Sequence, residues 1–149
     1  MGLPRLPLRA AYLHLDNPKR RNALSLSVLR SLRDQLLAFN TSPSGRLRIL
    51  PPFKPHLVDS LERGDDEYAW LVDADVWRRE REDLPNVLVL RSEGPVFCSG
   101  HDLGELKALS HDEVKETFKI CAEVMALIRR SPAPVIGVIQ GTRPHRPAP

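Results

Sequence analysis

The chain has 149 residues, a formal net charge of +3 and 42% hydrophobic residues, which is enough for one domain with a buried core. Acidic residues are interleaved with the basic ones over most of its length, so the charge pattern argues against nucleic acid as a partner. No long, continuous apolar run is present, and we therefore expect no insertion into a membrane.

The two cysteines, Cys98 and Cys121, are too few for a disulfide framework and have no neighbours at zinc-ligand spacing. We therefore expect a reducing compartment and no metal site. The opening residues contain two arginines and no acid, which is similar to an organelle transit peptide, although they also contain prolines. Whether this segment acts as a transit peptide stays open: a mitochondrial location is expected if it does, and a cytoplasmic one if it does not.

The first expected unit is a strand, a basic loop and a helix. Residues 10–15 read AAYLHL and end at the turn signal Asp16-Asn17-Pro18, which predicts a strand. After Leu24 the apolar residues follow helical steps up to Phe39, and either Ser25 or Ser27 is available to cap the helix.

Residues 41–84 lack this order. They mix proline pairs, charge runs and isolated aromatic residues without a sustained period, which predicts an irregular insertion. Within it only the segment from Asp73 to Asp83 has a spacing that suits a helix.

Regular structure is expected again from residue 86 onward. Residues 87–90 form a buried-type strand, and residues 111–130 form a helix that Ser110 and Glu113 open as a capping box. The apolar stripe of this helix is expected to lie in the core; it comprises Val114, Phe118, Cys121, Met125 and Ile128. A strand over 135–139 completes a right-handed parallel crossover, and the polar, proline-rich residues 142–149 are expected to be disordered.

The stretch that could carry chemistry is GPVFCSGHDL, residues 94–103. It lies between the strand at 87–90 and a short helical segment, LGELKAL. Gly100 allows the backbone to turn sharply, so that the next amide N–H, that of His101, points outward at the start of a helix. A backbone N–H in that place stabilises a developing oxyanion.

Three motifs in this order resemble the crotonase (enoyl-CoA hydratase/isomerase) superfamily: NPKRRNAL, FCSGHDL and SPAPVIGVIQG. The resemblance covers residues 10–40 and 86–141. It implies an α/β fold, namely a single partial crotonase-like domain over 1–149, with an incomplete spiral of ββα repeats, an atypical insert at 41–84 and a tail at 142–149. It also implies homo- or hetero-oligomers with crotonase-family subunits.

The resemblance implies acyl-CoA as substrate or ligand, with no covalently bound cofactor and no metal. The backbone N–H of His101 takes the place of the first oxyanion donor. The residues that would border the CoA groove and the thioester are Asn22, Ala23, Leu24, Gly100, His101, Asp102, Leu103 and Gly104. Lys19, Arg20 and Arg21 are candidates for contacts with the CoA phosphates, and an ordinary solvated loop is the alternative for them.

In relatives the second oxyanion donor and the hydratase glutamates lie beyond the strand that here leads to Gly141, where this sequence continues with Thr142 and Arg143. Whether the chain is an enzyme is therefore left open. The leading hypothesis is a crotonase-like protein of fatty-acid and acyl-CoA metabolism, as a truncated isoform or an imperfect gene model. The alternatives are an interaction or regulatory fragment that associates with full-length crotonase subunits, and a small basic binding module.

Two residues have competing interpretations. Cys98 is either a nucleophile or, since no base can be assigned to it, a packed thiol. Asp102 is either a general acid or the cap of the helix that follows it.

Overall fold

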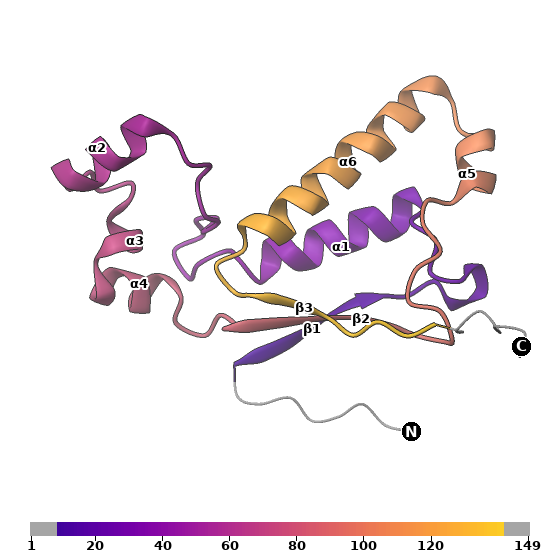
Figure 1. Ribbon diagram of the computed structural model, residues 1–149, viewed down its shortest axis with the longest axis horizontal. Helices are drawn as coiled ribbons and strands as arrows, with labels where there is room; N and C mark the ends of the chain where they lie inside the picture. Colours follow the sequence, from indigo (N-terminus) through magenta and orange to yellow (C-terminus); the bar gives the residue numbers. More distant parts are fainter. Residues whose placement is uncertain (1–8, 142–149) are drawn as a thin grey trace, which may run out of the picture.

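A three-stranded parallel sheet with two helices on one face forms the centre of the computed structural model, which describes residues 9–141 (Figure 1). The strands are β1 (Ala10–Leu15), β2 (Val87–Ser92) and β3 (Val135–Gly137), and they lie in that spatial order. Leu13 pairs with Leu90 in one interface and Leu88 with Val135 in the other. The predicted transit segment and the predicted disordered tail lie largely or wholly outside the described residues.

Both strand connections place their long helix on the same face of the sheet (Figure 1). The chain runs from β1 through a short 3-10 turn, η1 (Pro18–Arg20), and helix α1 (Leu26–Ala38) to the second strand. From β2 it runs through α5 (Leu103–Ala108) and α6 (His111–Arg130) to β3. Parallel strands need such crossovers, and the predicted α/β class with a parallel strand, helix and strand unit is confirmed.

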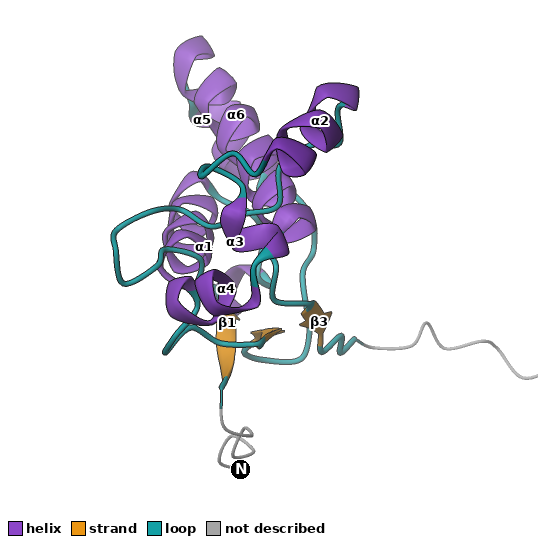
Figure 2. Ribbon diagram, turned by 90° about the vertical axis from the view of Figure 1, so that its left-hand side faces the viewer, coloured by secondary structure: helices purple, strands orange, loops and turns teal. Residues whose placement is uncertain are grey.

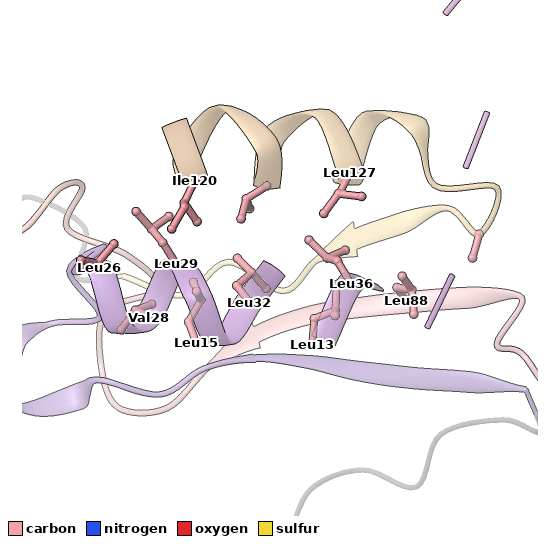
Figure 3. Close-up of a cluster of buried hydrophobic side chains, with 12 residues drawn as sticks. Leu13, Leu15, Leu26, Val28, Leu29, Leu32, Leu36, Leu88, Ile120 and Leu127 are labelled. Carbon is pink, nitrogen blue, oxygen red and sulfur yellow. The ribbon is translucent and has the colours of Figure 1, made fainter. Parts of the chain in front are cut away.

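The core lies between the sheet and the α1–α6 pair (Figure 3). Leu13 and Leu88 lie on neighbouring strands, and Leu29 and Leu36 lie on α1. All four residues are fully buried. Alternate residues of β1 face this core, as a half-buried strand requires.

Helix α6 begins as the sequence predicts, because Ser110 and Glu113 form the reciprocal capping box. The Ser110 hydroxyl and backbone N–H both bond the Glu113 carboxylate, and these bonds lower the pKa of Glu113.

The predicted core face of α6 is right in part: Cys121 and Ile128 pack against the core as partly buried side chains, but the most deeply buried face lies one residue position away. Phe118 and Met125 are about half exposed, at 50% and 49%. The side chains that α6 buries are those of Thr117, Ile120, Val124 and Leu127. Successive residues are rotated by about 100° on a helix, so two neighbouring apolar stripes coexist here, and only contact with α1 decides which one is buried.

Residues 41–84 carry more regular structure than the sequence predicts. They contain three short helices, α2 (Pro55–Arg63), α3 (Ala69–Val72) and α4 (Ala74–Glu80), grouped at one end of the α1–α6 layer (Figure 1), the end that faces the viewer in Figure 2. The last of these lies within the segment where a helix was expected. The region is joined to the core by a pair of bonds, from the Leu50 N–H to the Arg130 carbonyl and from Arg130 Nε to the Leu50 carbonyl.

Across residues 9–141, none of the helices combines the length and apolar character needed to cross a membrane. The same part of the chain holds no cluster of three or more side chains suited to a metal ion.

Candidate acyl-binding site at the carboxyl edge of the sheet

The loops that follow β1 and β2 meet at the carboxyl edge of the sheet, where open α/β folds place their ligands. Leu24 and His101 form an isolated parallel bridge. The Leu24 N–H donates to the Gly100 carbonyl at 2.8 Å, and the Asp102 N–H donates to the Leu24 carbonyl at 3.3 Å. A further bond from the Ser99 N–H to the Arg21 carbonyl, 3.1 Å long, holds the two loops together.

The His101 N–H points away from this bridge. In a parallel pair the residue opposite is bonded through its two neighbours, so the intervening N–H faces the other side. No acceptor among residues 9–141 receives the His101 N–H. Gly100, directly before it, has a φ of 90°, a left-handed conformation that favours glycine.

Asp102 completes the bridge through its backbone N–H and caps the next helix through its side chain. Its Oδ1 accepts the Glu105 N–H at 3.0 Å as the N-cap of α5, and it also accepts a 2.7 Å bond from Arg20 Nη2. The Asp102 side chain is only 4% exposed. The capping interpretation of Asp102 is thus the one that the structure contains.

Gly104 leaves room for this ion pair. A Cβ atom at position 104 would lie 2.9 Å from Arg20 Nη2 and 3.5 Å from Asp102 Oδ1. A larger residue would therefore push the Arg20 guanidinium off the carboxylate. Of the three basic residues predicted for CoA phosphates, Arg20 is engaged in this way, while Lys19 and Arg21 are exposed on the loop.

Glu105 is a site residue that the sequence did not single out. Its Oε2 accepts the Leu26 N–H at 2.9 Å, at the first position of α1, while the Ser25 hydroxyl caps the same helix through Val28. A carboxylate at a helix N-terminus is favourable because the free N–H groups there carry partial positive charge. The local signal for this residue is an acidic side chain in the first turn of a helix. Its partner, Leu26, is 79 positions away in the sequence, so no local pattern indicates the contact.

An open hollow of about 580 Å³ lies between the two loops and the start of α1. Asp102 and Gly104 line it, together with Arg20, Glu105 and the hydroxyl-bearing Ser25 and Ser27. The other predicted residues lie around the bridge and do not line this hollow.

Asn22 acts as a clamp between the loops. Its Oδ1 accepts the Asn17 N–H at 2.8 Å, and its Nδ2 donates to the Glu93 and Val96 carbonyls at 2.6 and 2.8 Å. The side chain is completely buried. Asn22 as a whole exposes no surface in this structure, and the predicted groove positions of Asn22, Ala23 and Leu24 stay predictions.

The His101 imidazole turns toward α6. Its ring packs at 5.1 Å from the Phe118 ring, and Nε2 lies 3.8 Å from Cys121 Sγ. Burial raises the pKa of Cys121, so the thiol is neutral. The other thiol, Cys98, accepts the Gly100 N–H at 3.4 Å and packs against the core, which agrees with the packed-thiol interpretation.

Known proteins share this fold and part of this sequence. The Rattus norvegicus protein named enoyl-CoA hydratase domain-containing protein 3, mitochondrial, is 37% identical over 128 residues, which is 85% of this chain and 29% of the relative. The crystal structure of human enoyl-CoA hydratase domain-containing protein 3 is 31% identical with a TM-score of 0.54, over 91% of this chain and 39% of the human one. The chain belongs to the crotonase superfamily.

A more distant structure supports the fold alone. Enoyl-CoA hydratase from Bacillus anthracis superimposes with a TM-score of 0.58 at 20% identity, over 89% of this chain and 36% of the bacterial one. No family profile matches the chain.

The chain spans less than a third of the length of the rat relative and less than two fifths of the solved crotonase chains, so the predicted incomplete spiral is confirmed. The alignment with the rat protein covers more of this chain than residues 10–40 and 86–141 contain. The likeness therefore extends further along the sequence than the three motifs indicated.

Proposed function

We propose that this crotonase-superfamily chain binds acyl-CoA thioesters, with the His101 backbone N–H donating to the thioester carbonyl. The observation that carries the proposal is the orientation of this N–H, which faces away from the Leu24 bridge and has no acceptor within the described part of the chain. A rigid donor of this kind loses little entropy on binding and is matched to an oxygen that gains negative charge.

The surroundings suit the remainder of such a ligand. Gly100 to Gly104 would border the thioester and pantetheine, and residues 23 and 24, beside the buried Asn22, would line the nucleotide side. Lys19 and Arg21 are exposed on the loop after β1, where they would meet phosphates at the rim.

We also propose that residues 1–149, taken alone, bind acyl-CoA without turning it over. Of the two oxyanion donors that the family uses, we assign one, the His101 N–H, to residues 1–149. Loss of one such donor costs about 3 kcal/mol of transition-state stabilisation. No acid/base carboxylate is assigned beside the His101 N–H either, because Asp102 and Glu105 both cap helices.

Two substitutions at position 101 test the donor. His101→Pro removes the N–H, whereas His101→Ala keeps it and removes only the imidazole. In calorimetric titrations with hexanoyl-CoA we expect the proline variant to bind about 3- to 10-fold more weakly and the alanine variant to stay within about twofold of the wild type. Thermal melting shows that each variant is folded. Equal affinities for the two folded variants would refute the assignment.

A second candidate function is association with crotonase-family subunits, in homo- or hetero-oligomers. The observation that favours it is the apolar surface around β3, where Ile136, Val138 and Ile139 are 54%, 51% and 79% exposed. Such surface commonly marks an interface. Light scattering of the chain, alone and mixed with a full-length crotonase subunit, would detect this association; a monomer in both samples would exclude it.

We place the protein in mitochondria, because the relatives from rat, mouse and human carry the word mitochondrial in their names, and we infer a role in fatty-acid or acyl-CoA metabolism from the words enoyl-CoA hydratase in the same names. Microscopy of the full chain with a carboxyl-terminal fluorescent tag tests this location. A diffuse cytoplasmic signal would contradict it.

A further inference from the structure

A second polar hollow, of about 280 Å³, lies at the opposite end of the sheet, where β1 and β2 begin. Helix α4 lies beside this end (Figure 1). Arg9, Arg78 and Arg81 line the hollow together with Trp77 and Asn86. Three arginines thus line one hollow, at the end of the sheet opposite to the Leu24–His101 bridge.

Arg81 is the unusual member of this cluster. Its side chain is only 2% exposed, and its Nη2 donates to the Pro85 carbonyl at 2.8 Å. Its Nη1 is buried without a hydrogen-bond partner, and none of the ion pairs within residues 9–141 includes Arg81. A buried charge and a buried donor both ordinarily have partners, so something is needed to satisfy this group.

Arg48 shows what the same arrangement looks like when it is complete. Its guanidinium lies 5.6 Å from the Trp70 ring centroid, just as that of Arg81 lies 5.6 Å from the Trp77 ring centroid. Arg48 is also buried, but its Nε bonds the Glu80 carboxylate at 2.9 Å. Each of the two stacked tryptophans thus packs against an arginine. Among residues 9–141, Arg48 has an anionic partner and Arg81 has none.

The neighbouring residues add positive charge around Arg81. Arg9 Nη2 donates to the Arg81 carbonyl at 2.7 Å. Burial, followed by the charge of Arg9, lowers the pKa of Arg81, which is the effect expected when cations gather without a counter-ion. The ion pair between Arg78 and Asp75 is exposed at the rim, so Arg78 can exchange it for a ligand.

We propose that this hollow binds the phosphate group of a small phosphate monoester. Guanidinium groups bind phosphate oxygens through paired N–H donors, and a doubly charged tetrahedral group offers acceptors to arginines that approach from different directions. The volume exceeds that of a phosphate ion, which leaves space for a compact organic portion. The site is independent of the proposed thioester site.

The chain contains a built-in reporter for a test. Trp70 and Trp77 are its two tryptophans, and their rings stack at 5.6 Å beside the hollow. Titration of the full chain with inorganic phosphate, and with glycerol 3-phosphate, should change the tryptophan fluorescence saturably, whereas glycerol and potassium chloride at matched ionic strength should not. A linear change, or an equal change with potassium chloride, would overturn the proposal as an effect of ionic strength.

Two adjacent arginines give a matched pair of variants. Arg78→Gln removes a ligand from the rim of the hollow, and Arg79→Gln removes an exposed arginine that does not line it. We expect about 3- to 10-fold weaker phosphate binding for the first variant and less than a twofold change for the second. Equal effects of the two substitutions would refute the site. Arg81→Met should abolish binding, and circular dichroism shows whether this buried variant is folded.

Discussion

The backbones of Leu24 and His101 lie side by side as a parallel bridge, nine residues beyond the end of each participating strand. This bridge joins the loops after β1 and β2, and Gly100 supplies the turn that leads into it. The orientation of the His101 N–H therefore depends on a loop contact and on one glycine.

Gly100→Ala should disturb this turn. A Cβ atom at residue 100 would meet no heavy atom within 4 Å, so the cost arises from the φ of 90° alone and amounts to about 1–2 kcal/mol. Urea denaturation should show that loss of stability, and titration with hexanoyl-CoA should show weaker binding. The control is Gly141→Ala, since Gly141 has open space and no left-handed φ. Full affinity in the Gly100 variant would contradict this account.

Asn22→Ala should be among the most destabilising polar substitutions. It removes the partner of the Asn17 N–H and of the Glu93 carbonyl and leaves the Val96 carbonyl with the Ser92 hydroxyl, which we expect to cost about 2–4 kcal/mol in the free energy of unfolding. Chemical denaturation measures this quantity. Lys19→Ala, on the exposed part of the same loop, serves as the control and should change it by less than about 0.5 kcal/mol. A similar small change for Asn22→Ala would show that the clamp contributes little.

The face of α6 that packs on α1 can be identified by substitution. Ile120→Ala removes a side chain that is 3% exposed and should cost about 2–5 kcal/mol. Met125→Ala, at a position 49% exposed, should cost about 1 kcal/mol or less. Both values come from denaturation midpoints of the folded chain. A larger loss of stability for Met125→Ala than for Ile120→Ala would show that the face predicted from the sequence is the buried one.

The sequence predicts the elements of the central unit well and their tertiary partners poorly. Residues 10–15 and 111–130 form the predicted strand and helix because period, turn residues and caps are local signals. The three helices in 41–84 were largely missed, since proline pairs and charge runs mask short helices whose stability comes from contacts such as the Arg48–Glu80 ion pair.

The candidate site shows the same division. The turn at Gly100 and the cap at Asp102 are local features that the FCSGHDL motif predicts. The bonds from the Leu26 N–H to Glu105 and from Asn22 to the 93–96 loop join residues more than 70 positions apart, and no local pattern indicates them.

The Arg48–Glu80 ion pair should make stability depend on acidity. The hydrogen bond from Arg48 lowers the pKa of Glu80, so the pair stabilises the fold above the unfolded pKa of about 4.3, and this contribution disappears as the pH falls through the lower, folded value. Glu80→Gln should therefore be less stable than the wild type at pH 7, and the difference should shrink at pH 3. Denaturation at both pH values measures it, with the exposed Glu62→Gln as control. A difference that grows in acid would contradict the sign.

The most direct test of the central claim is the nuclear magnetic resonance signal of the His101 amide proton in chain labelled with ¹⁵N-histidine. On addition of hexanoyl-CoA this proton should move downfield as it bonds the thioester carbonyl. S-hexyl-CoA, a thioether that has the same chain length but no carbonyl, should leave it nearly unchanged. Equal shifts with the two ligands, or none with either, would show that the His101 N–H does not hold the thioester oxygen.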